Sequence, residues 1–295
     1  MKKFSFAWLL IVPAIVFTFN FFFVKNQDRF YMNWTDSSYA YLFNGMNLAN
    51  GKMEIGHTDN PGTTVQIAAG VLIKLIHVFS GKNPDLVNDV LTDPEKYLHI
   101  LSFIFIVSSC LILFYLGYVV RKWSANTWLA IFIQSGIIVS FPSLTCMADI
   151  RSEPLLIMGG FLYVAICFSF IHEKEMTQKK MFRYSIKFAA ICAFLIITKM
   201  TAVPVAILPF FLLRKWKSYF LYLAALPVFT ILFFFPALPK TKIFFHWVKD
   251  LFFHSGFYGQ GKTSIIDFST AGQNLIYMSY DIPFVICCSI MFAAL

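Results

Sequence analysis

The amino-acid sequence predicts an all-α polytopic membrane protein with about eight transmembrane helices and a structured first loop outside the membrane. Hydrophobic residues make up 58% of the 295 residues, whereas charged residues make up only 13%. The mean hydropathy is +0.69, and several apolar runs reach the ~20 residues that cross a bilayer. Because roughly a quarter of the residues of a soluble domain are charged, the composition excludes a soluble globular protein.

Short basic clusters lie between the apolar runs and predict the orientation of the chain. They comprise Lys2-Lys3, Arg121-Lys122 and the basic residues of 174–183 and 214–217. Lys and Arg of short loops stay on the cytoplasmic side of a membrane, so all of these clusters and the N-terminus are expected in the cytoplasm. The net charge of +9 is thereby explained by topology, and no nucleic-acid partner is expected.

The spans can be assigned in chain order. The first apolar run lacks a small-x-small cleavage site before Lys25 and is interpreted as a retained span rather than a signal peptide. Arg183 and Arg214 both belong to cytoplasmic clusters, so the segment between them is expected to be a hairpin of two short helices that turns at Lys199. Each arm of this hairpin is expected to be shorter than a full span. The predicted spans lie near 5–24, 97–120, 126–142, 154–171, 185–198, 200–213, 218–238 and 275–295.

The sequence stops at Leu295 within an apolar run. A single membrane domain over 1–295, truncated at its C-terminal end, is therefore expected.

With the N-terminus inside, the long polar stretches share the extracytoplasmic face. These stretches are 25–96, 142–153, the turn at Lys199 and 239–274.

The first extracytoplasmic loop, 25–96, is expected to contain surface helices. From Asp36 to Asn50-Gly51, apolar residues recur at helical spacing. After Pro61, a second helix is expected to lie along the membrane surface, and a transmembrane alternative for 61–80 would invert everything downstream. Its apolar stripe comprises Val65, Ala68, Ala69, Leu72, Leu75, Ile76 and Phe79, and its other face Gln66, Gly70, Lys74 and His77.

Polar residues of this face are candidates for chemistry, although each also has a structural interpretation. Asp36 stands at a helix start, where Asp is a preferred N-cap. Asp59 and Asn60 lie in the stretch GHTDNPGTT, which a turn before a helix also explains, and His57 beside them can be a solvated loop residue. The later loop FFHSGFYGQGKTS contributes His254 and Tyr258, and it lacks the spacing of a nucleotide-binding P-loop.

Charged residues at the mouth of the fourth span form a second group. Asp149, Arg151 and Glu153 are close neighbours in the sequence, and Arg151 and Glu153 can simply pair with each other. Lys199 is centred in the apolar hairpin. Ionisable groups at membrane depth are costly and usually mark function, whereas the structural alternative is a lysine that extends to the membrane surface.

The order and placement of these motifs resemble the multispan glycosyltransferases of the C superfamily (GT-C). The similar branch contains the protein O-mannosyltransferases, the aminoarabinose transferase and the bacterial RgtA/B/C/D-like proteins. The resemblance is carried by an Asp-x-x-Tyr helix after the first span, an Asn-Pro-Gly-Thr turn, an Arg-x-Glu entry to the fourth span, a Thr-Lys hairpin and a His-Ser-Gly-x-Tyr-Gly loop. The family's frequent His-Pro pair is replaced here by Asn60-Pro61, and the family normally has additional spans.

The resemblance implies that a sugar moves from a polyprenyl-phosphate-linked donor to a glycan, lipid or protein acceptor, outside a bacterial plasma membrane. It implies that Asp36 is the general base and Asp59 a second catalytic acid. It also implies that Lys199 and Arg151 bind the donor phosphate. Glu153 or Asp149 would orient Arg151, and His254 and Tyr258 would close the site. No organic cofactor is expected, but Asp36 and Asp59 could share a Mg²⁺ or Mn²⁺ ion.

Two other classes of function are compatible with the sequence. A transporter or flippase of lipid-linked glycans also has charged residues among its spans, but the paired inverted halves typical of transporters are not visible here. A non-catalytic, truncated homologue of the enzymes is the other alternative. The structured outer loop with acids before a surface helix favours the enzyme.

Overall fold

The computed structural model describes residues 6–26, 30, 38–58, 62–253, 270, 272–274 and 276–277. All regular structure within these residues is helical, which confirms the predicted all-α class. The elements are η1 (Phe6–Leu10), α1 (Ile11–Lys25), α2 (Ser38–Ala49), α3 (Thr63–Ser80), α4 (Leu86–Thr92), α5 (Pro94–Ser124), α6 (Thr127–Ser135), α7 (Phe141–Cys146), α8 (Ser152–Ile171), α9 (Gln178–Thr198), η3 (Met200–Ile207), α10 (Leu208–Leu212), α11 (Trp216–Phe234), η4 (Phe235–Lys240) and α12 (Thr241–Phe253).

The chain is a multi-pass membrane protein by the length and composition of its helices. Six helical segments are long and apolar enough to cross a bilayer: Phe6–Lys25, Thr63–Ser80, Pro94–Ser124, Ser152–Ile171, Gln178–Thr198 and Trp216–Leu251. Large apolar side chains remain exposed along them, as expected where lipid covers the protein. The predicted number of eight spans is not confirmed, and the last predicted span, 275–295, lies outside the described helices.

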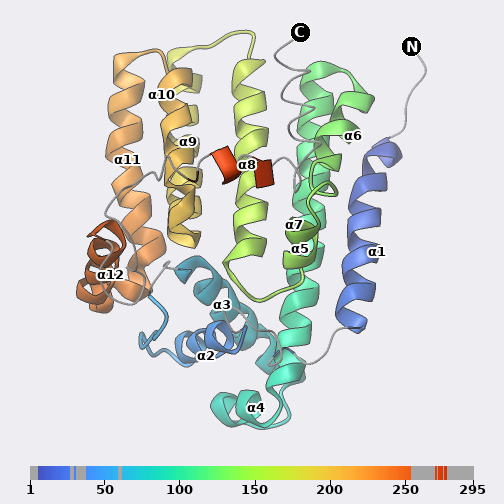
Figure 1. The fold of residues 1–295 in the computed structure, drawn as a ribbon, viewed down its shortest axis with the longest axis vertical. Coiled ribbons are helices and arrows are strands. Elements are labelled where there is room, and N and C mark those ends of the chain that lie inside the picture. The colour runs from blue at the N-terminus through green and yellow to red at the C-terminus, as the bar shows by residue number, and fades with distance from the viewer. Residues whose placement is uncertain are drawn as a thin grey trace.

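The predicted span 126–142 is wrong as a single helix. The chain instead forms α6, of nine residues, and α7, of six residues. Gly136 follows α6, while the Ser140 side chain caps α7 by accepting from the Ser143 N–H, and Pro142 occupies the first turn of α7. Glycine, a capping serine and proline each favour a helix boundary, so this passage is broken in two (Figure 1).

The hairpin between the basic clusters is present and turns at Lys199, as predicted. The expectation that both arms are short is wrong for the first arm, because α9 has 21 residues, enough for a full crossing. The second arm, Met200–Leu212, is short. Pro204 lies within it, and most of it is 3₁₀ helix. A proline removes a helical hydrogen bond, which explains the irregular arm.

Figure 1 shows that the helices form a bundle with two different ends. The basic end contains the turns after α5, α8 and α10, with the clusters at Arg121, 174–183 and 214–217. Phe6 lies at the same end, since the Arg121 guanidinium sits 4.2 Å from the centre of its ring. The opposite end, called here the loop end, contains α2, α3, α4 and α12. The shared location of the basic clusters agrees with the predicted topology.

Helix α3 lies across the loop end of the bundle rather than alongside the spans (Figure 1). It contacts α2 and α4 on the loop side and α5, α8, α9 and α11 of the bundle. The predicted assignment of its faces is partly wrong. Gln66 and Gly70 are buried, whereas Leu75 and Phe79 are exposed, because α2 covers the face that was expected to be polar.

Two glycines permit α2 and α3 to approach closely. A Cβ atom on Gly45 would lie 2.8 Å from the Ala69 Cβ, and one on Gly70 would lie 3.0 Å from the Gly45 carbonyl oxygen. Glycine has no Cβ, so the two backbones can pack directly, as in small-residue contacts between membrane helices. Gly51, in a left-handed conformation with φ +78°, then ends the segment after α2.

The buried carboxylate of Asp89 anchors α4. It accepts hydrogen bonds from the Tyr97 hydroxyl and from the backbone N–H groups of Lys82 and Asn83, the latter two at 2.9 Å. Burial by itself would raise the pKa of Asp89, but these hydrogen bonds, together with one to His77, hold that pKa well below its usual range. The loop after α3 is therefore fixed by an ionised acid.

The close approach of α2 and α3 predicts a large effect of one methyl group at Gly45. We expect Gly45→Ala to destabilise the protein by about 1–3 kcal/mol, the usual cost of overpacking. Gly160→Ala on α8 is the matched control, since nothing lies within 4 Å of its added Cβ. Thermal unfolding of the two variants measures the difference, and equal unfolding temperatures would disprove the close contact.

The predicted orientation can be tested by cysteine labelling in intact cells. A membrane-impermeant maleimide should label Lys52→Cys at the loop end and should not label Gln178→Cys at the basic end, because basic clusters stay cytoplasmic. Permeabilised cells should label both positions, and the parent chain gives the background from native cysteines. External labelling at residue 178 would reverse the topology.

Candidate functional site

The structure describes some of the predicted site residues and not others. Asp36, Asp59, Asn60, His254 and Tyr258 lie outside the described residues, so their roles stay predictions. The described candidates are His57, Asp149, Arg151, Glu153 and Lys199. His57 contacts α3 through Gln66, Asp149, Arg151 and Glu153 lie at or just before the start of α8, and Lys199 follows the end of α9.

Lys199 and Glu153 form an ion pair between the hairpin and the fourth predicted span. The Lys199 Nζ atom donates to Glu153 Oε1 at 2.5 Å. Lys199 is the residue after α9, in extended conformation, and Glu153 lies in the first turn of α8. The two side chains are 22% and 21% exposed, so the pair is half-buried and still open to solvent.

Arg151 pairs with Asp149 rather than with Glu153, the partner that the simplest structural interpretation gave it. One guanidinium nitrogen contacts the Asp149 carboxylate and lies 3.6 Å from the Cys146 sulfur. Burial alone would lower the pKa of Arg151, but the carboxylate of Asp149, with a smaller contribution from Glu153, raises it. Asp149, Arg151, Glu153 and Lys199 are together called the charged cluster.

The first turn of α3 connects the charged cluster to the rest of the loop end. The Thr63 hydroxyl donates to the Phe233 carbonyl at 2.9 Å. Thr198, next to Lys199, uses its own proton on the Phe194 carbonyl at 2.6 Å. The 2.7 Å contact between the Thr64 and Thr198 hydroxyls is therefore donated by Thr64. The turn between α9 and η3 is therefore held at the start of α3.

His57 is held at α3 as well, on a different face. Its Nε2 atom lies 3.2 Å from the Tyr41 hydroxyl, and its carbonyl accepts from Gln66 Nε2 at 2.8 Å. Gln66 and Thr64 are two residues apart, and side chains at this spacing point to nearly opposite sides of a helix. His57 is thus ordered near the start of α3 without contacting the charged cluster.

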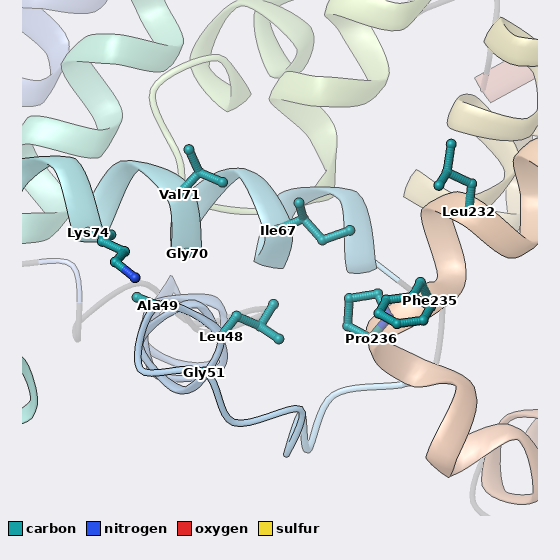
Figure 2. A pocket seen from close by; sticks show the side chains of 10 residues that line it. All are labelled: Leu48, Ala49, Gly51, Ile67, Gly70, Val71, Lys74, Leu232, Phe235 and Pro236. Carbon is teal, nitrogen blue, oxygen red and sulfur yellow. The ribbon is translucent and has the colours of Figure 1, made fainter.

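An apolar groove lies between α3 and the end of α11 (Figure 2). This α3 groove has a volume of about 350 Å³. Figure 2 shows residues of α2 and α3 along one side and residues of α11 and η4 along the other. Leu232 of its lining precedes Phe233, whose carbonyl binds Thr63. The lining residues are Leu48, Ala49, Gly51, Ile67, Gly70, Val71, Lys74, Leu232, Phe235 and Pro236.

The described residues contain no group of His, Cys, Asp and Glu side chains that could together hold a metal ion. Asp36 and Asp59, the predicted ligands of a divalent cation, are not among the described residues. Metal binding by this pair therefore stays a prediction.

Comparison with known proteins gives no family. No family model matches the chain, and no curated protein or solved structure matches it significantly. The resemblance to GT-C enzymes therefore rests on the motifs and their placement.

Several residues of the site could not be chosen from the sequence. Thr64, Thr198 and Cys146 lie inside the stretches that the motifs mark. Their partners, however, come from distant segments: Thr64 and Thr198 are 134 positions apart. Only the helical packing brings such residues together, and small hydroxyl side chains are too common in apolar helices to be singled out by spacing.

The Lys199–Glu153 pair predicts a coupled effect on stability. Glu153→Gln and Lys199→Met should each destabilise the fold by about 1–3 kcal/mol, less than the ~3–5 kcal/mol of a fully buried pair. The reason is that each variant leaves one half-buried charge without its partner. The double variant should lose clearly less than the sum of the single losses. Unfolding in detergent measures this coupling, and strictly additive losses would show that the two charges act independently.

Proposed function

We propose that this protein is a glycosyltransferase that uses a polyprenyl-phosphate-linked sugar donor on the extracytoplasmic face of the membrane. The observation that carries the proposal is the charged cluster, in which two cations are each held by an acid. The start of α3 links this cluster to an apolar groove, through Thr64 to Thr198 and through Thr63 to Phe233. A lipid phosphate needs both a cationic partner for its head and apolar surface for its chain. The motif resemblance to GT-C enzymes supports the same function.

The acids of the cluster explain how the two cations can serve a phosphate. Glu153 and Asp149 supply the opposite charges for Lys199 and Arg151 in a half-buried place, where an isolated charge would be costly. The planar guanidinium of Arg151 suits phosphate oxygens, and the Lys199 ammonium acts as a point charge. A donor phosphate would share these cations with the acids, so that the cations are positioned before the donor arrives.

The α3 groove supplies the second requirement. Its lining is apolar except for Lys74, which Figure 2 shows at its edge near α2. The first turn of α3 links the groove to Lys199. Thr63 binds Phe233, which follows Leu232 of the groove, and Thr64 binds Thr198, which precedes Lys199. A donor with its isoprenoid chain in this groove would bring its phosphate toward the charged cluster.

In the proposed reaction, an acceptor hydroxyl attacks the anomeric carbon of the sugar. A bond forms between the acceptor oxygen and this carbon, and the bond from the carbon to the phosphate oxygen breaks. The acceptor proton passes to the Asp36 carboxylate, and the polyprenyl phosphate leaves with the bonding electron pair. Lys199 and Arg151 stabilise the negative charge that grows on the leaving phosphate, which is a charge that the transition state gains over the ground state.

A lipid-linked-glycan transporter is the second candidate, and one observation favours it. An acid–base pair between two helices, such as Lys199 and Glu153, also occurs along the proton and substrate pathways of transporters. The two functions differ in their products. An enzyme releases free polyprenyl phosphate and a glycosylated acceptor, whereas a transporter moves the intact lipid between leaflets.

Turnover of radiolabelled polyprenyl-phosphate sugar tests the proposal. Asp36→Asn should lower turnover by ~10²–10⁴, the usual loss when a general base is removed. Lys199→Met should lower it by ~10²–10³, similar to the loss of one donor to a developing oxyanion. Lys52→Met, at the same end of the molecule, should leave turnover unchanged.

A stability control separates chemistry from folding. The Glu153→Gln/Lys199→Met double variant should recover part of the lost stability and none of the lost turnover. Full turnover in folded Asp36→Asn and Lys199→Met proteins would refute the proposed roles, and movement of intact donor without transfer would favour the transporter.

A further inference from the structure

A second groove lies between α1 and α5, on the α1 side of the bundle. Its volume is about 450 Å³, and its lining consists of Phe21, Val24, Lys25, His99, Phe103 and Ile106. The polar members lie near helix ends, since Lys25 is the last residue of α1 and His99 lies in the second turn of α5. Both helices belong to segments that are long and apolar enough to cross a membrane.

We propose that this α1–α5 groove is a binding site for one anionic phospholipid. The lipid phosphate lies between Lys25 and His99, and an acyl chain lies along the apolar wall. The Lys25 ammonium offers three donors, and the His99 ring carries at least one N–H in either neutral tautomer. The ends of spans are the depth at which headgroups lie. Among the described residues, those that line the groove include no acid, so their charge complements an anion.

Contacts outside the groove hold its polar wall in place. The Phe30 ring packs edge-on against the His99 ring, with 5.2 Å between ring centres. The Phe30 N–H donates to Glu95 Oε2 at 3.3 Å, and the Tyr39 hydroxyl donates to Glu95 Oε1 at 2.7 Å. Glu95, one turn before His99, is therefore engaged with these two groups, and His99 is ordered before any ligand arrives.

The apolar wall is ordered in the same way. Phe103 packs edge-on against Phe17, with 6.2 Å between ring centres, and Phe17 stacks on Phe21 at 6.0 Å. A preformed wall lowers the entropic cost of binding a flexible acyl chain. A lysine that merely extends to the membrane surface also attracts anionic lipid, but it needs neither an ordered histidine nor a groove, and its attraction would not depend on the apolar wall.

Lipid retention by the purified protein tests this site. The protein is exchanged into detergent with equal amounts of phosphatidylglycerol and phosphatidylcholine, and the retained lipids are counted by native mass spectrometry. The wild type should keep one phosphatidylglycerol in preference to phosphatidylcholine. Lys25→Gln/His99→Gln should lower this preference about fivefold or more, whereas Lys52→Gln removes a lysine outside the groove and should retain it.

A variant of the apolar wall tests the same site without changing its charge. Val24→Trp fills part of the groove and should lower phosphatidylglycerol retention as well, with the fold verified by thermal unfolding. The proposal is overturned if the Lys25/His99 variant or Val24→Trp retains phosphatidylglycerol like the wild type. It is also overturned if Lys52→Gln loses as much. Because no turnover is measured, the result is independent of the proposed transferase activity.

Discussion

A lysine at the end of an apolar helix stays charged in a membrane protein only where an acid or solvent faces it, and this constraint organises the loop end. Lys199, at the end of α9, forms an ion pair with Glu153, in the first turn of α8. The start of α8 and the end of α9 therefore lie at the same level, and the turn at Lys199 lies beside the start of α8. Asp149 and Arg151, just before α8, then join the same cluster.

The surface layer of α2 and α3 depends on this arrangement. The start of α3 is attached to the end of α9 through Thr64 and to the end of α11 through Thr63. On its other side α3 contacts α2 through Gly45 and Gly70, where the two backbones meet directly. The layer is therefore a rigid connection between the first loop, which carries Asp36, and the helices that carry the cations. The proposed catalytic acid and the proposed phosphate site come from separate segments, and such a connection would keep their geometry.

The all-α class of the membrane helices and the turn at Lys199 were predictable because they follow from local composition. Apolar runs, the clusters at Arg121, 174–183 and 214–217 and the turn at Lys199 are local features, and the bilayer acts on each of them separately. The break within 126–142 also has a local cause, because Gly136, Ser140 and Pro142 each favour a helix boundary. A prediction from hydropathy alone does not detect them, since the residues around them are apolar.

The pairing within the site was not predictable. Glu153 and Lys199 are 46 positions apart, and the identity of a partner depends on how α8 and α9 pack. The faces of α3 were misassigned for the same reason. Hydropathy treats Gln66 and Gly70 as exposed, whereas the contact with α2 buries Gly70 and the buried Gln66 side chain donates to the His57 carbonyl. Tertiary contacts therefore decide which face of an amphipathic helix is covered.

In the proposed binding mode, a lipid phosphate binds at the charged cluster with its chain in the α3 groove. Photocrosslinking with a polyprenyl phosphate that carries a photoreactive group on its first isoprene units measures this directly. Mapping of the labelled peptides in lipid nanodiscs should place the label on α3 around Ile67 and Val71 and on α11 around Leu232, and unlabelled polyprenyl phosphate should compete for it. Label that resists competition, or that falls mainly on α1 and the basic end, would contradict the account.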